Sequence, residues 1–188
     1  MNWLAHLYLS EPTAEFRVGN LLPDLVGPPV LAGLPAAFQR GIVQHRRIDA
    51  FTDAHPVFRR SVQRFEPPLR RFGGIIVDLA YDHFLARDWS THSEQPLGEF
   101  TREVYAGFGD VAGQLPPEIA LPLQAMRTQD WLGSYHELGG LTLALSRMGR
   151  RLKRPVDLAA AVPIIERNYE GFHADFREFF PDLKAHVA

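Results

Sequence analysis

The chain has 188 residues, 46% of them hydrophobic, and a formal net charge of −2. This length suffices for one domain with a substantial core, and the composition excludes general disorder. The near-neutral charge gives no reason to expect nucleic-acid binding, and the absence of cysteine excludes disulfides, thiolate nucleophiles and zinc–thiolate sites.

The first residues do not resemble a signal peptide, because Met1–Leu7 has no basic stretch followed by a long apolar run. No apolar run in the chain approaches the roughly 20 residues that span a bilayer. We therefore expect a soluble, cytoplasmic protein that does not engage membranes. The sequence indicates no oligomeric state.

Proline and glycine divide the chain into segments of helical length. The pattern leaves Asn2–Leu9 open between strand and helix, and it predicts a loop over Gly27–Pro35. Helices are expected over 12–22, 36–52, 57–71, 75–89, 97–108, 117–131, 133–148 with a break near 139–140, and 157–180. Asp157 should cap the last of these and Pro181 should end it. Because period-two alternation is absent, the prediction is an all-α, single-domain helical bundle spanning residues 1–188.

Two of these helices carry polar pairs within apolar arcs. At about 100° per residue, Asp49 lies about 40° from His45, in an arc shared with Phe38 and Ile42. On the helix predicted over 75–89, the spacing of Asp78 and Asp82 is the same.

Inward carboxylates and imidazoles are costly unless something neutralises them, and a divalent cation does so effectively. Each residue alone has a structural alternative, since Asp49 could pair with Arg46 or Arg47, and Asp82 with Arg87 or His83. The coincidence of two such helices favours a metal centre. Two further polar residues support a metal centre: His6, in the apolar N-terminal segment, and Asp24, which follows Asn20-Leu-Leu-Pro. The candidate metal ligands are therefore His6, Asp24, His45, Asp49, Asp78 and Asp82.

A His/Asp metal centre on a helical scaffold suits phosphoester hydrolysis, because the ion activates water and neutralises charge on the phosphoryl oxygens. Mixed ligands of this kind suit Mn²⁺, Fe²⁺, Mg²⁺ or Zn²⁺, while the lack of thiolates argues against structural zinc. Arg46, beside His45, could clamp a phosphate or could be a solvated surface charge. Asp53 lies at the edge of the arc, near the metal or on the surface.

Several motifs, in order and spread over most of the chain, resemble the bacterial acyl carrier protein phosphodiesterase family. They are Asn2-Trp-Leu-Ala-His6-Leu, Gly19-Asn-Leu-Leu-Pro-Asp24, His45-Arg-Arg-Ile-Asp49 with Thr52-Asp53, Asp78-Leu-Ala-Tyr-Asp82-His83-Phe-Leu and Gln129-Asp130-Trp131-Leu.

The resemblance implies removal of 4′-phosphopantetheine from the serine of holo-acyl carrier protein, with Mn²⁺ as the expected ion and Mg²⁺ or Fe²⁺ as alternatives. It also implies a divergent relative of the HD-domain phosphohydrolases, which are helical proteins with a His/Asp metal centre. The ordinary HD motif is absent, since the only adjacent pair is the reversed Asp82-His83. The catalytic candidates are His83, as a ligand or general acid, together with Arg46 and Asp82.

An acidic carrier protein would need a positive docking surface, and two groups of residues offer one. The first arginine patch, preferred because it lies nearer in sequence to the polar helices, comprises Arg59, Arg60, Arg64, Arg70 and Arg71. The second basic patch comprises Arg147, Arg150, Arg151, Lys153 and Arg154. Either could also be an ordinary solvated face.

Two other functions remain open at this point. A metal phosphohydrolase acting on nucleotides or another small phosphodiester would use the same metal site. A non-catalytic helical adaptor for an acidic partner would use the arginines alone and would bind no divalent metal.

Overall fold

The computed structural model describes the whole chain, Met1–Ala188. It contains no strand, which confirms the all-α prediction. The α-helices are α1 Trp3–Tyr8, α2 Ala14–Gly19, α3 Pro28–Ala32, α4 Ala36–Ala54, α5 Pro56–Gln63, α6 Gly73–Arg87, α7 Leu97–Val111, α8 Pro117–Thr128, α9 Trp131–Ser134, α10 Leu138–Arg151, α11 Val162–Arg167 and α12 Tyr169–Val187. Short 3₁₀ helices are η1 Leu22–Asp24, η2 Leu69–Phe72, η3 Trp89–Thr91, η4 Ala112–Gln114 and η5 Leu158–Ala161.

Several boundaries differ from the sequence prediction. The predicted helix 57–71 stops at Gln63, because Pro67 and Pro68 interrupt it before η2. The expected loop 27–35 contains α3, which begins at Pro28. The last predicted helix is divided into η5, α11 and α12, and Pro181 lies inside α12 rather than at its end. Asp157 does accept a hydrogen bond from the Ala159 N–H, as a cap of η5.

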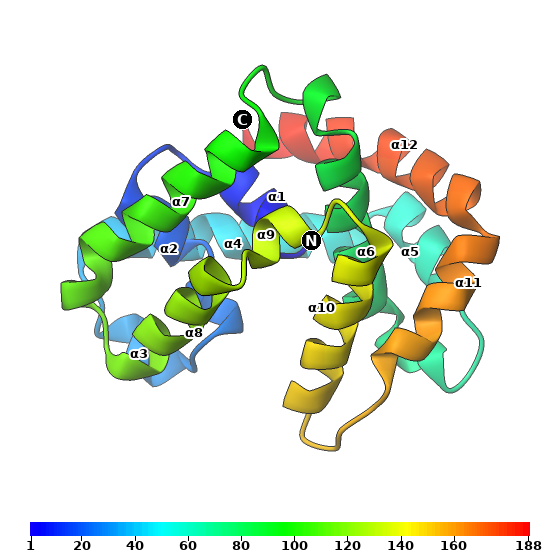
Figure 1. Cartoon of the computed structure of the whole chain (residues 1–188), viewed down its shortest axis with the longest axis horizontal. Helices are drawn as coiled ribbons and strands as arrows, with labels where there is room; N and C mark the ends of the chain where they lie inside the picture. The colour runs from blue at the N-terminus through cyan, green and yellow to red at the C-terminus, as the bar shows by residue number, and fades with distance from the viewer.

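Helix α6 lies at the centre of the molecule (Figure 1). It contacts α1, α5, α10 and α12, and its residues are buried on almost every side. This explains why its sequence is apolar all round rather than along one stripe. One continuous core of 47 buried residues connects the elements around it. No helix combines the length and apolar character needed to cross a bilayer.

Helices α2 and α4 approach so closely that two glycines are required where they cross. A Cβ on Gly41 would overlap the carbonyl oxygen of Phe16 and would lie 2.6 Å from the amide nitrogen of Asn20. A Cβ on Gly19 would overlap the carbonyl oxygen of Phe38. The crossing holds Asn20, at the end of α2, against α4.

We expect Gly41→Ala to destabilise the protein by about 1–3 kcal/mol, because the new methyl group must separate two backbones. This lowers the melting temperature by several degrees in a domain of this size. Gly74→Ala, on the first turn of α6, is the control, since a Cβ there meets nothing within 4 Å. It should leave the melting temperature unchanged or raise it slightly, because alanine favours helix. Equal melting temperatures for the two variants would contradict the close crossing.

Candidate metal centre

Three side chains that could hold a metal ion converge between α1 and α4. His6, His45 and Asp49 each present a donor atom, and these atoms all lie within 4.8 Å of one another. Asp49 Oδ2 is 2.9 Å from His45 Nε2, and Asp49 Oδ1 is 3.2 Å from His6 Nε2. The two imidazole rings stack with their centroids 4.2 Å apart. We call these three residues the His–Asp cluster.

Asn20 sets the orientation of both imidazoles. Its backbone carbonyl accepts from His45 Nδ1 at 2.8 Å, and its side-chain oxygen accepts from His6 Nδ1 at 3.0 Å. The Asn20 amide nitrogen donates to the His6 carbonyl and to Ser10 Oγ, which fixes the side-chain oxygen on the His6 side. Each Nδ1 therefore carries a proton, and each Nε2 points into the cluster as a potential ligand.

The surroundings of His6 Nε2 fit a cation. This nitrogen lies 3.1 Å from the Met1 carbonyl oxygen and 3.2 Å from Asp49 Oδ1, both of which are acceptors. When Nδ1 holds the proton of a neutral ring, Nε2 brings a third lone pair to the same place. A divalent metal ion at this position would accept all three lone pairs, and nitrogen and carboxylate ligands together suit the first-row transition metals.

The charges of the cluster support each other without an ion as well. Burial opposes ionisation of Asp49, but hydrogen bonds from His45 and His6 outweigh it and hold the Asp49 pKa far below its usual range. Burial lowers the pKa of His45, while the hydrogen bond to Asp49 and the charge of Asp24 raise it by more. Asp49 is therefore an anion at neutral pH, ready to bind a cation.

The cluster opens to solvent on its carboxylate side. His6 and His45 are buried, whereas the Asp49 side chain is 42% exposed. Asp24 and Asp78, which border the cluster, are 35% and 29% exposed. The carboxylate side of the cluster therefore faces solvent, and the buried imidazoles lie behind it.

Asp24 and Asp78 adjoin the cluster rather than complete it. Asp24 Oδ1 lies 3.7 Å from His45 Nε2, and its other oxygen accepts from the Trp3 indole N–H at 2.9 Å. The α-amino group of Met1 lies 2.6 Å from Asp78 and 4.0 Å from Asp49, so it stands between these two carboxylates. Burial raises the pKa of Asp78, and the Met1 ammonium opposes that rise.

Asp82 has a different position from the one expected of a metal ligand or catalytic residue. It is fully buried, and its two oxygens accept the backbone N–H groups of Leu4 and Ala5 at 2.7 and 3.1 Å. These are unpaired amides of the first turn of α1, so Asp82 caps that helix from α6. Burial raises its pKa to about 7, although the two amide hydrogen bonds act in the opposite direction.

His83 is not brought to the cluster either. Its Nδ1 donates to the Tyr135 carbonyl at 2.7 Å, and its Nε2 lies 2.6 Å from the Tyr169 hydroxyl. Both partners belong to other parts of the molecule, at the end of α9 and the start of α12. Burial lowers the pKa of His83, which keeps the ring neutral. These hydrogen bonds connect α6 to α9 and α12. They point the His83 ring away from the His–Asp cluster.

Two exposed residues of α4, Arg46 and Asp53, lie near the cluster. Arg46 is exposed and forms no hydrogen bond or ion pair, so its guanidinium is free to contact a phosphate. Asp53 is also exposed, one turn beyond Asp49, and it is a surface residue.

Comparisons with known proteins identify the family of this chain. The model of the family described as "Acyl carrier protein phosphodiesterase" matches residues 1–183. The chain belongs to the acyl carrier protein phosphodiesterase family. Curated relatives with this name include proteins of Enterobacter sp. (strain 638) and Serratia proteamaculans (strain 568), 32% and 34% identical over 184 and 185 residues. Each alignment covers 97% of this chain and 95% of the relative. No solved structure gives a significant match, so kinship with HD-domain proteins stays a prediction.

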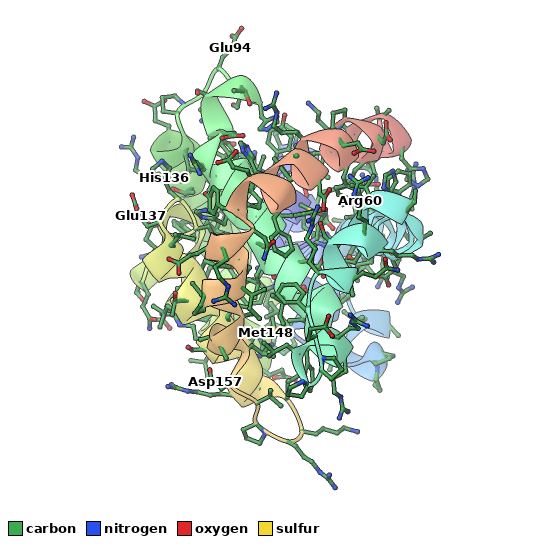
Figure 2. The ribbon with its side chains drawn as sticks, turned by 90° about the vertical axis from the view of Figure 1, so that its right-hand side faces the viewer. Arg60, Glu94, His136, Glu137, Met148 and Asp157 are labelled. Atoms are coloured by element: carbon green, nitrogen blue, oxygen red, sulfur yellow. The ribbon has the colours of Figure 1, made fainter.

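Most arginines of the first arginine patch form ion pairs or hydrogen bonds within the protein. Arg60 and Arg64 both bind the buried carboxylate of Asp175, and Arg60 also binds Glu178. Figure 2 shows Arg60 beside α12. Arg70 pairs with Glu66, and Arg59 donates to a backbone carbonyl. These arginines hold α5 and η2 in place, which leaves little free positive charge for a partner.

The second basic patch is free of carboxylate partners. Arg150, Lys153 and Arg154 are exposed and form no ion pair. Arg151 donates to the Asp24 carbonyl at 3.0 Å, which places this end of the patch near the His–Asp cluster. Arg71, from the first patch, shares a groove with Lys153 and Arg154. Side chains with nitrogen tips extend into solvent from the loop before Asp157 (Figure 2).

Sequence reasoning missed the orienting role of Asn20 and the place of two tryptophans beside the site. The family-like motif contains Asn20, but the two histidines that bind its side-chain oxygen and its backbone carbonyl lie on two other helices. Trp3 and Trp131 stack with their ring centroids 5.6 Å apart, although 128 positions separate them. Their conspicuous position within two family-like motifs was the only available signal.

We expect Asp49→Asn to weaken Mn²⁺ binding by more than the roughly 10- to 100-fold that outer-shell substitutions cost. The reason is that the amide lacks the charge that joins the two imidazoles. Asp53→Asn removes a carboxylate from the next turn of the same helix and should bind Mn²⁺ as the original protein does. Calorimetric titration of the metal-stripped proteins measures both. Equal affinities would show that the ion, if bound, lies elsewhere.

Proposed function

We propose that this protein is a metal-dependent phosphodiesterase that releases 4′-phosphopantetheine from the serine of holo-acyl carrier protein. The observation that carries the proposal is the solvent-facing His–Asp cluster in a member of a family named for this activity. Mn²⁺ is the ion that we propose, because the family resemblance implies it and the carboxylate of Asp49 is a ligand that suits it.

His6, His45 and Asp49 would hold the ion, and Asp24, whose Oδ1 lies 3.7 Å from His45 Nε2, could bind a water of that ion. The ion would activate water and offset charge on the phosphoryl oxygens. The exposed Arg46 and the guanidinium of Arg151, which is anchored on the Asp24 carbonyl, are placed to bind the phosphate. Asp24, a partly exposed carboxylate at the rim of the cluster, is the group placed to take a proton from attacking water.

The decisive experiment incubates metal-stripped protein with holo-acyl carrier protein, with and without added Mn²⁺, and follows the carrier by mass spectrometry. We expect conversion to the apo-carrier only when Mn²⁺ is present, with free 4′-phosphopantetheine as the second product. Asp49→Asn should remain inactive at Mn²⁺ concentrations that activate Asp53→Asn. Hydrolysis of nucleotides without attack on the holo-carrier would favour a different phosphohydrolase. Binding of the carrier with neither metal uptake nor hydrolysis would favour an adaptor.

We further propose that the acidic carrier docks on the second basic patch rather than on the first. Three arginines of the first patch are neutralised by carboxylates, whereas the second has no such partner and begins at Arg151, beside the cluster. Complementary charge of this kind speeds association and depends strongly on salt.

Reversing charge at two positions tests this choice. We expect Lys153→Glu with Arg154→Glu to raise KM for the holo-carrier about tenfold or more at low salt, within the range that electrostatic steering supplies. The control, Arg59→Glu with Arg177→Glu, changes the net charge equally at exposed residues that form no ion pair. Arg60 and Arg64 are avoided because they neutralise buried Asp175. Similar KM values for both double variants, or an effect that persists at high salt, would contradict the assignment.

A further inference from the structure

Two tryptophans and two arginines form a stack beside Asp24. The rings of Trp3 and Trp131 lie 10° from parallel, with their centroids 5.6 Å apart. The Arg147 guanidinium lies 4.5 Å from the centroid of the Trp131 ring, and that of Arg151 lies 5.7 Å from the centroid of the Trp3 ring. We call these four residues the tryptophan–arginine stack. They come from α1, α9 and α10, which approach one another near the amino terminus (Figure 1).

Gln129 anchors the stack on its Trp131 side. The side-chain oxygen of Gln129 accepts from the Trp131 indole N–H at 3.0 Å and from Arg147 at 2.6 Å. Arg147 and Arg151 lie one turn apart on α10, so one face of that helix brings a cation to each indole ring. The Trp3 ring is 4% exposed and packed between these neighbours. It therefore has little freedom to turn.

The stack holds Asp24 at two points. Trp3 donates its indole N–H to Asp24 Oδ2 at 2.9 Å, and Arg151 donates to the Asp24 backbone carbonyl at 3.0 Å. The bond from Trp3 is the only hydrogen bond that the Asp24 carboxylate accepts within the protein. With Oδ2 held in this way, Oδ1 lies on the side of the His–Asp cluster, 3.7 Å from His45 Nε2.

We propose that Trp3 is a positioning residue for Asp24, acting through the hydrogen bond of its indole N–H, and that the rest of the stack keeps the indole in place. The inference rests on the proposed function, in which Asp24 receives a proton from the attacking water. An indole has one N–H donor, and in a fixed ring it points in one direction. It therefore selects one orientation of a carboxylate that would otherwise rotate, as partners of metal-site residues commonly do.

The two tryptophans of the stack then have different requirements. The Trp131 N–H binds the exposed Gln129, so only the flat ring of Trp131 serves Asp24. Trp3 must supply both the ring and the donor. Phenylalanine offers an aromatic ring without a donor, so the same substitution at the two positions separates these roles.

The kinetic test compares kcat and KM for hydrolysis of holo-acyl carrier protein by the Mn²⁺-loaded variants. Trp3→Phe should lower kcat about tenfold or more and leave KM unchanged, because it removes the partner that orients Asp24. Trp131→Phe should keep both values near those of the original protein. Trp89→Phe is the matched control, since Trp89 is also 4% exposed and donates its indole N–H to a backbone carbonyl, that of Gln95.

A double-mutant cycle shows whether Trp3 acts through Asp24. Asp24→Ala should lower kcat by itself, and adding Trp3→Phe should cause no further loss, because the carboxylate that Trp3 orients is already absent. Losses that multiply in the double variant would overturn the proposal. Equal kcat values for Trp3→Phe and Trp89→Phe would overturn it as well.

Nuclear magnetic resonance of the metal-free protein tests the hydrogen bond without a reaction, and it covers the case in which Trp3→Phe does not fold. The chain has three tryptophans, so Trp89→Phe and Trp131→Phe assign the indole N–H resonance of Trp3 by elimination. Asp24→Ala should shift this resonance and leave that of Trp89 in place, because a bond to a carboxylate is charge-assisted. A Trp3 resonance that does not respond to Asp24→Ala would contradict the proposal.

The two measurements separate this proposal from the proposed function. If the original protein hydrolyses no holo-carrier while the Trp3 resonance responds to Asp24→Ala, the proposed function fails and the orientation of Asp24 by Trp3 stands. If the holo-carrier is hydrolysed equally well by Trp3→Phe and Trp89→Phe, the proposed function stands and the positioning role of Trp3 fails.

Discussion

The site depends on the hydrogen bonds between the buried carboxylate of Asp82 and the first turn of α1. This carboxylate accepts the Leu4 and Ala5 amides and so fixes the beginning of α1 against the central helix α6. An isolated helix of six residues is not stable in water, so α1 requires such tertiary contacts. Because α1 carries both His6 and Trp3, this one carboxylate positions a member of the His–Asp cluster and the indole that donates to Asp24. A residue outside the His–Asp cluster thus helps to determine the geometry of that cluster.

Asn20 has the corresponding role for ring orientation. This one residue, at the end of α2, accepts hydrogen bonds from the Nδ1–H groups of two histidines on different helices. The glycine crossing of α2 and α4 keeps its backbone within reach of His45. The packing of α1, α2 and α4 therefore determines the direction in which both Nε2 atoms point.

Local spacing was enough to predict part of this arrangement. His45 and Asp49 lie on one helix, four residues apart, so helical periodicity predicted their proximity before any tertiary structure was known. The same periodicity treated Asp78 and Asp82 alike, because it cannot show that the partners of Asp82 are backbone amides of another helix. The first arginine patch looked free for a similar reason. Its neutralising partners Asp175 and Glu178 follow more than 100 residues later, and only the packing of α12 against α5 reveals them.

The division of the His–Asp cluster between two helices has a consequence for folding. His6 comes from a short helix near the start of the chain, and its partners come from α4. A cation shared by these residues would cross-link the two elements, and its binding free energy would add to that of the native state. At a free ion concentration 1,000 times the dissociation constant, this linkage contributes about 4 kcal/mol. A chelator would then act on the native fold as well as on the reaction, and the supply of metal would govern how long the protein survives.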